Sequence, residues 1–286
     1  MLNYELSRFK KGILLCYFDS LDIVQHMFWR YIDPEHPLYD RHASAERKEM
    51  IYTWYRRMDD VLGSVIKELN NNDTIIILSD HGFGTFRRAA HLNSWLRANG
   101  YLQLKNPQAD SGAELLNDID WSKTKAYAIG FGAIYINKIR FGNTKLSRLD
   151  YNATQLKEEI SKKLEDWIDE KYNQRVVSKV YKNEEIFNGE YAKEAPDLYI
   201  GFNMGYRASW QTALGSVPKE LLEDNLKKWS GDHLFDPGII PGVILSNKKI
   251  IKDNPSIYDM APTILKFIGY TDKQLKECDF DGNALF

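Results

Sequence analysis

Three short motifs in this chain combine aspartate with histidine. In chain order they are Asp22 with His26, Asp80 with His81, and a Gly-Asp-His triplet that ends at His233. Imidazole nitrogens and carboxylate oxygens without thiolates are ligands that suit zinc or manganese. Two such ions side by side can stabilise the attacking and leaving oxygens of a phosphoryl transfer. The residue types therefore indicate metal-assisted phosphoryl chemistry.

Each motif also has an ordinary structural explanation. Asp22 and His26 could be a pair on the solvated face of a helix, and Asp80 could belong to a polar turn before Gly82. His233 could be a loop histidine. What favours a metal site is their placement. A spacing of four residues puts Asp22 and His26 on one helix face, and ligands in α/β proteins bind beyond the carboxyl ends of strands.

The elements that would position these motifs alternate between strand and helix. The apolar, mostly β-branched stretch Thr74–Leu78 predicts a strand buried on both faces, ending at Ser79 and Asp80. Gly12–Phe18 predicts another buried strand, and a helix over 21–31 follows with Ser20 as its N-cap. Such alternation predicts an α/β fold with a doubly wound, mostly parallel sheet and helices on both faces.

The rest of the chain extends this pattern within a single domain, 1–286. Residues 105–217 interrupt the simple rhythm, and we interpret them as a cap-like excursion. Apolar periodicity predicts helices at Ala43–Leu69, His91–Asn99, Ala153–Glu170 and Ile257–Ile268, and strands at Tyr101–Leu104, Arg175–Tyr181, Asp197–Phe202 and Gly242–Ser246. Lys125–Ile136 is expected to form two short strands around Gly130 and Gly132.

Composition excludes several classes of protein. With a formal net charge of −2 over 286 residues, there is no electrostatic case for a nucleic-acid polymer or an anionic membrane as partner. The two cysteines form no Cys-x-x-Cys motif and no disulfide framework. No apolar run approaches the roughly 20 residues of a membrane span, and the amino terminus has no secretory signal. These features are more typical of a cytoplasmic protein, although an upstream segment could carry an export signal.

The order of the motifs resembles the alkaline phosphatase superfamily, and within it the type I phosphodiesterase/nucleotide pyrophosphatase branch. The resemblance runs from about Gly12 to the carboxyl end. It rests on Asp22-x-x-x-His26, Ser79-Asp80-His81-Gly82, Gly231-Asp232-His233 and the tail Asp259-x-Ala261-Pro262-Thr263-Ile264-Leu265.

The resemblance implies a role for each motif. Asp22, His26 and His233 would bind one metal, usually zinc, and Asp80 and His81 would supply half of a second site. The substrates would be small phosphodiesters or pyrophosphates, nucleotides among them, although relatives act on sulfate esters and phosphonates. The implied fold is alkaline-phosphatase-like.

Two parts of the family's machinery have no match in this chain. The family completes its second metal site with an aspartate and a threonine or serine nucleophile at the end of the first core strand. We find neither before Gly12, and Thr53 and Thr85 do not match the nucleophile position. The chain is therefore expected to correspond to the carboxyl-terminal portion of such an enzyme, missing its first strand or strands. We expect it to be weak or inactive alone and to self-associate through an exposed sheet edge.

Two other functions stay open on the sequence. The chain could be a non-catalytic metal-binding or interaction module on the same fold, or a phosphomutase of the same superfamily. Some polar residues also have two interpretations. Asn203, Tyr206, Arg207 and Trp210 could contact substrate or form a structural loop, and His36 and His42 flank a proline-containing turn and are expected in solvent.

Overall fold

The computed structural model describes residues 2–137 and 153–286. This part of the chain forms two compact units. The first unit comprises Met1–Val24, Glu49–Gly82 and Pro241–Phe286, and the second comprises Gln25–Lys48 and Phe83–Ile240. The second unit holds the contiguous apolar core, whose buried residues run from Ala90 to Val217.

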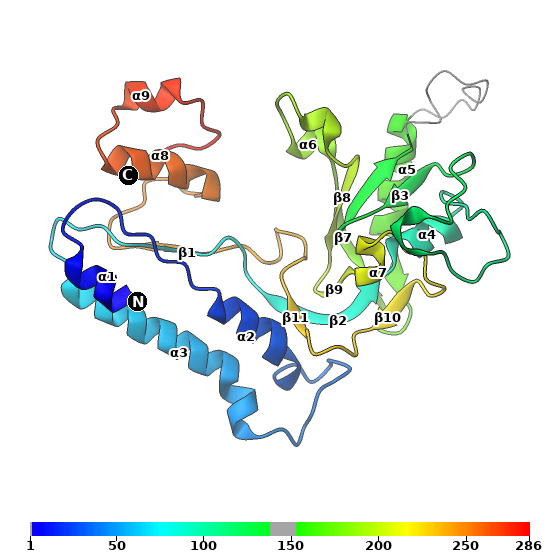
Figure 1. The fold of residues 1–286 in the computed structure, drawn as a ribbon, viewed down its shortest axis with the longest axis horizontal. Helices are drawn as coiled ribbons and strands as arrows, with labels where there is room; N and C mark the ends of the chain where they lie inside the picture. The colour runs from blue at the N-terminus through cyan, green and yellow to red at the C-terminus, as the bar shows by residue number, and fades with distance from the viewer. Residues whose placement is uncertain (1, 138–152) are drawn as a thin grey trace. The chain divides into compact units, whose positions relative to one another are not determined.

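An antiparallel sheet and one amphipathic helix contribute to that core, together with Leu92, Trp95 and Leu96 of α4 (Leu92–Ala98). The strands follow the order β3-β4-β8-β7, with bounds Ala126–Ala128, Ala133–Ile136, Leu198–Phe202 and Val177–Lys182. Helix α5 (Ala153–Glu165) lies along β7 (Figure 1), and it buries Leu156, Ile160 and Leu164, which recur every fourth residue. The predicted turn between β3 and β4 is confirmed, and its Gly130 and Gly132 have φ values of 80° and 104° that glycine adopts without strain.

A second sheet is centred on β2 (Gly84–Ala90), as Figure 1 shows. It pairs antiparallel with β10 (Leu222–Asp224) and β11 (Gly231–Asp232), and parallel with β9 (Gly205–Ala208). Sequence analysis missed β2, because two arginines at its centre hide the apolar pattern. The structure pairs both: Arg87 Nε lies 2.7 Å from Asp33 Oδ2, and Arg88 Nη1 lies 2.7 Å from Asp169 Oδ1.

Shorter elements complete the second unit. They are η1 (Trp29–Tyr31), α4 (Leu92–Ala98), η2 (Glu114–Leu116), β5 (Ile168–Asp169), β6 (Gln174–Arg175), α6 (Asn183–Ile186), η4 (Ala192–Glu194) and α7 (Trp210–Ala213). The described parts of the excursion predicted at residues 105–217, which are 105–137 and 153–217, lie within this unit, and residues 138–152 lie outside the described residues. Its role as a cap stays a prediction.

The first unit is mainly helical. Its helices are α1 (Leu2–Arg8), η5 (Ile257–Asp259), α8 (Met260–Phe267), α9 (Asp272–Glu277) and, from Glu49 on, α3 (Ala45–Glu68). Strand β1 (Ile76–Leu78) pairs antiparallel with β12 (Ile244–Ser246). Helix α2 (Ser20–Phe28) begins in this unit and continues without a break into the second.

The terminal Asp-x-Ala-Pro-Thr motif stabilises the fold of the first unit. The Asp259 side chain is fully buried and accepts hydrogen bonds from Lys252 Nζ (2.8 Å), Ser256 N (2.7 Å) and Asn283 N (2.8 Å). Burial acts to raise the pKa of this carboxyl, but the hydrogen bonds and the Lys252 charge hold it below its usual value. Thr263 Oγ1 donates to the Asp259 carbonyl (2.6 Å). These two motif residues thus close the carboxyl-terminal segment onto α8.

The predicted α/β class is confirmed, but the sheet was predicted to be mostly parallel and the strand pairs are mostly antiparallel. Within the described residues, β2 with β9 is the one parallel pair between named strands, and the other pairs are antiparallel. The predicted strand Gly12–Phe18 has no regular secondary structure, and Leu15 and Tyr17 are 83% and 86% exposed. Without a neighbouring strand to accept its backbone hydrogen bonds, an apolar segment cannot form a buried strand. No helix within the described ranges is long and apolar enough to span a membrane.

The prediction that His36 lies in solvent is wrong. His36 is only 3% exposed, and its Nε2 lies 3.0 Å from the carbonyl oxygen of Phe86 in β2. Because a carbonyl can only accept, Nε2 carries the proton, and Nδ1 accepts from the Leu38 backbone N–H at 3.0 Å. Both ring nitrogens are thus satisfied by the neutral ring, and burial lowers the pKa of His36 to about 4.

This buried histidine is expected to make the second unit sensitive to acid. The unfolded chain takes up the His36 proton near pH 6.5 and the folded chain near pH 4, so the free energy of unfolding should decrease as the pH falls through that window. The slope should reach about 1.4 kcal/mol per pH unit. Urea denaturation of the wild type and of His36→Gln between pH 7 and pH 4 measures it. Equal slopes in the two proteins would contradict the assignment.

Candidate metal centre

Helix α2 carries two of the three candidate ligands. Asp22 and His26 lie one turn apart on it, and the ring of His26 is almost fully buried. Because one continuous helix holds both residues, their relative position follows from the helical repeat alone. This juxtaposition could be predicted from spacing.

Strand β11 lies against α2 and so brings the third ligand, His233, which directly follows it, close to His26. The His26 carbonyl oxygen accepts from the Ser230 backbone N–H at 2.6 Å, and His26 Nδ1 lies 2.7 Å from the Gly231 carbonyl oxygen. Since that carbonyl can only accept, Nδ1 carries the ring proton. The neutral His26 ring therefore has its lone pair on Nε2, the form required of a metal ligand.

Gly231 allows β11 to approach α2 this closely. A Cβ atom at this position would lie 2.7 Å from the Gln25 carbonyl oxygen, 2.8 Å from Phe83 Cε1 and 3.0 Å from Trp29 Cβ. All three distances are shorter than ordinary van der Waals contacts. A residue with a side chain at position 231 would therefore clash with α2 and its neighbours, which explains the glycine of the Gly-Asp-His triplet.

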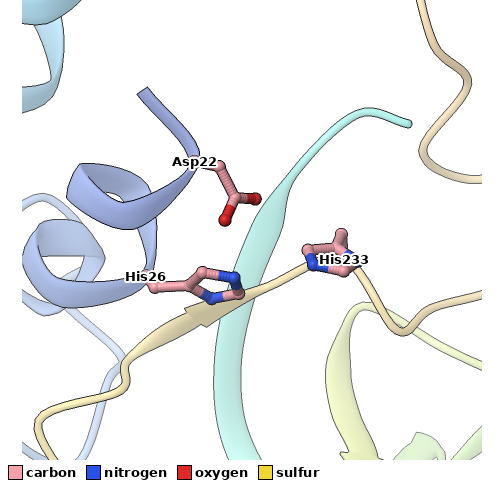
Figure 2. A group of neighbouring side chains, drawn as sticks. All are labelled: Asp22, His26 and His233. Carbon is pink, nitrogen blue, oxygen red and sulfur yellow. The ribbon is translucent and has the colours of Figure 1, made fainter. Parts of the chain in front are cut away.

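Asp22, His26 and His233 come together at this point. One possible ligand atom from each lies within 4.8 Å of the others. Figure 2 shows the Asp22 carboxylate and the two imidazole rings pointing toward one another, with α2 on one side and the chain beyond β11 on the other. A carboxylate with two imidazoles is a donor set that zinc accepts, and three protein ligands leave a position for water or substrate. The residues therefore fit a catalytic type of metal site.

Aromatic rings enclose the histidines. The Trp229 ring stacks on His26 with a centroid distance of 3.6 Å and an interplanar angle of 26°. Phe83 meets the same ring edge-on at 4.7 Å and the His233 ring at 5.7 Å. These contacts restrict the rotation of both imidazoles, as preorganised ligands require.

A buried ion pair lies next to the site, because one of its members, Asp232, directly precedes His233. Arg207 Nη1 and Asp232 Oδ2 are 2.6 Å apart, and both side chains are at most 2% exposed. Burial lowers the pKa of the Arg207 guanidinium, while the Asp232 carboxylate acts in the opposite direction. The sequence pattern predicts no role for Asp232, and it is compatible with a substrate contact for Arg207. The one sequence feature that points to a role for Asp232 is that it directly precedes His233.

The family follows from comparison with known proteins. A family model described as type I phosphodiesterase/nucleotide pyrophosphatase matches residues 4–223, most of the chain. The chain belongs to this family. Its match ends before His233, so the role of that residue rests on the geometry given above.

A solved structure is similar to this chain. The human ectonucleotide pyrophosphatase/phosphodiesterase 5 structure is similar at 13% sequence identity with a TM-score of 0.38. The alignment covers 94% of this chain and 66% of that one. No curated protein matches the chain in sequence.

The second predicted half-site, Asp80 and His81, lies within the first unit. Within residues 2–137 and 153–286, the one group of three or more candidate ligands consists of Asp22, His26 and His233. Asp80 and His81 belong to the first unit, where His81 Nε2 lies 3.5 Å from Asp80 Oδ1 and His81 Nδ1 lies 2.8 Å from the Gly82 carbonyl oxygen. The binding of a metal by Asp80 and His81 stays a prediction.

Two further polar residues are structural. Thr85 is buried, and its hydroxyl donates to Asp33 Oδ2 at 2.5 Å. Tyr206, considered above as a substrate contact, is also buried and donates to Asp169 Oδ2 at 2.9 Å. Neither hydroxyl is available to act on a substrate.

Proposed function

We propose that the chain is a metal-dependent hydrolase of phosphodiester or pyrophosphate bonds, with nucleotides among its candidate substrates. Two findings support this: the family that matches most of the chain, and the convergence of Asp22, His26 and His233 from separate segments. The convergence carries the proposal, because a purely structural role would not require two imidazoles to point at one carboxylate.

Asp22, His26 and His233 would hold one divalent ion, zinc or alternatively manganese. Such an ion, when bound, supplies Lewis-acid stabilisation of a phosphoryl oxygen and lowers the pKa of water. The chain's own residues prepare the site. The Gly231 carbonyl keeps the proton on His26 Nδ1, and Trp229 and Phe83 fix the plane of that ring.

Asp80 and His81 would provide part of a second site, and we assign no nucleophile. Groups that act together in catalysis lose most of their effect when one of them is missing. We therefore propose that hydrolysis by this chain alone is slow but dependent on metal.

Hydrolysis of bis(p-nitrophenyl) phosphate tests this function. The chelated protein, reloaded with zinc or manganese, is expected to release p-nitrophenol faster than the chelated form. His26→Ala should reduce the rate to that of buffer. His42→Ala removes an exposed histidine of the same unit and should behave as the wild type. Metal binding without any metal-dependent hydrolysis would instead favour the non-catalytic module.

A further inference from the structure

One carboxylate connects the groups that hold both histidines. Asp232 Oδ1 accepts from the backbone N–H groups of His233 (2.9 Å) and Leu234 (3.1 Å). Asp232 Oδ2 accepts from Arg207 Nη1 (2.6 Å) and from the Trp229 indole N–H (2.9 Å). Four donors occupy this carboxylate, so it has little capacity left to bind a metal. Asp232 instead contacts the backbone at His233, one candidate ligand, and the Trp229 ring, which stacks on His26, the other.

Arg207 fixes the position of that carboxylate. Its guanidinium carbon lies 4.6 Å, 5.2 Å and 4.5 Å from the ring centroids of Phe86, Phe131 and Trp210. Nε and Nη2 have no hydrogen-bond partner in the described structure, so the one hydrogen bond of the side chain goes to Asp232. Since strand β9 and three aromatic rings hold the guanidinium, Asp232 is held by a rigid part of the second unit.

Stability alone does not account for this pair. Burying two charges costs more desolvation than an apolar pair of similar volume, so a buried ion pair is weak evidence for stability. The pair also sets the geometry of the groups that its members contact. Here those groups are the Trp229 ring and the backbone of His233.

We propose that Arg207 and Asp232 are positioning residues for the metal site, acting through Trp229 on His26 and through the loop backbone on His233. This inference rests on the proposed function, because it assumes that the two histidines bind a metal. Asp22 and His26 both lie on α2, so the network acts on the orientation of the His26 ring, through Trp229, and on the backbone at His233. Weakening the network should therefore reorient the His26 ring and displace His233.

Zinc affinity of the full chain, measured by calorimetric titration with zinc alone, tests the proposal. Arg207→Gln and Asp232→Asn are expected to weaken zinc binding by roughly 10- to 100-fold, as loss of an outer partner of a metal ligand does. Trp229→Phe keeps an aromatic ring against His26 but removes the indole donor, and should weaken binding about fivefold. Because Trp229 is only partly buried, this variant should fold even if the other two do not.

Two further variants separate positioning from stability. Arg88 forms a comparable ion pair with Asp169 in the same unit, with side chains 11% and 3% exposed. Its other polar partners are the Leu222 carbonyl oxygen and Asp224, neither of which belongs to the metal site. Arg88→Gln should lower the unfolding temperature without changing zinc affinity. Arg207→Lys retains a charged donor for Asp232 and should recover most of the affinity lost in Arg207→Gln.

The outcomes distinguish this inference from the function on which it rests. Weaker zinc binding in Arg207→Gln and Trp229→Phe, with unchanged affinity in Arg88→Gln, supports positioning. Wild-type affinity in Arg207→Gln and Trp229→Phe would overturn the inference and leave the metal site intact. A wild-type chain that binds no zinc would overturn the proposed metal site and this inference with it.

Discussion

Replacing His233 with alanine should abolish specific zinc binding by the chain. His233 supplies one of the two imidazoles of the candidate site, and the remaining Asp22 and His26 are a helical pair that occurs on many protein surfaces. The loss should exceed the roughly 10- to 100-fold that removal of an outer partner costs. Elemental analysis of the purified protein gives the metal content per chain, and calorimetric titration with zinc gives the affinity.

The exposed His42 again provides the matched control. His42→Ala should retain the zinc content of the wild type, which is expected to be about one ion per chain with three ligands at a single site. Two ions per chain would indicate that Asp80 and His81 complete a second site. Zinc content unchanged by His233→Ala would remove that residue from the ligand set.

Gly231→Ala should lower both stability and zinc affinity. The added methyl group would lie 2.7 Å from the Gln25 carbonyl oxygen, which belongs to α2 and cannot rotate away as a side chain could. Overpacking of this kind typically costs about 1–3 kcal/mol in the free energy of unfolding. It would also push β11 from α2 and weaken the 2.7 Å contact between His26 Nδ1 and the Gly231 carbonyl. Urea denaturation and calorimetry measure the two effects.

Gly63→Ala is the appropriate comparison. Gly63 lies inside α3, and nothing lies within 4 Å of the position that its Cβ atom would take. Alanine there should stabilise the helix by up to about 1 kcal/mol and leave zinc affinity unchanged. Gly231→Ala with wild-type stability and affinity would show that the β11 loop adapts without disturbing the site.

The local elements of the second unit could be predicted from sequence because their signals are local. Leu156, Ile160 and Leu164 recur at a helical interval, and α5 forms there. Gly130 and Gly132 lie in the turn between two strands, where their positive φ values are needed. The prediction was wrong where an element depends on distant partners: Gly12–Phe18 is apolar enough for a strand but pairs with none in the described chain.

The candidate site divides in the same way. Residue types and the spacing of Asp22 and His26 predict a metal pair, since a helix converts that spacing directly into proximity. No local pattern could place Arg207 against Asp232, or Trp229 on His26, because the first contact joins strands β9 and β11 and the second joins a loop to helix α2.

The amino-acid sequence alone therefore predicts the types of candidate ligand, the helical pair and the family resemblance. Tertiary structure adds the convergence of His233 on that pair, the need for a glycine at position 231 and the buried ion pair next to the site. The physical reason is that a helix or a turn is specified by neighbours along the chain. The arrangement of a site depends instead on which surfaces pack together, and that is set by the whole core.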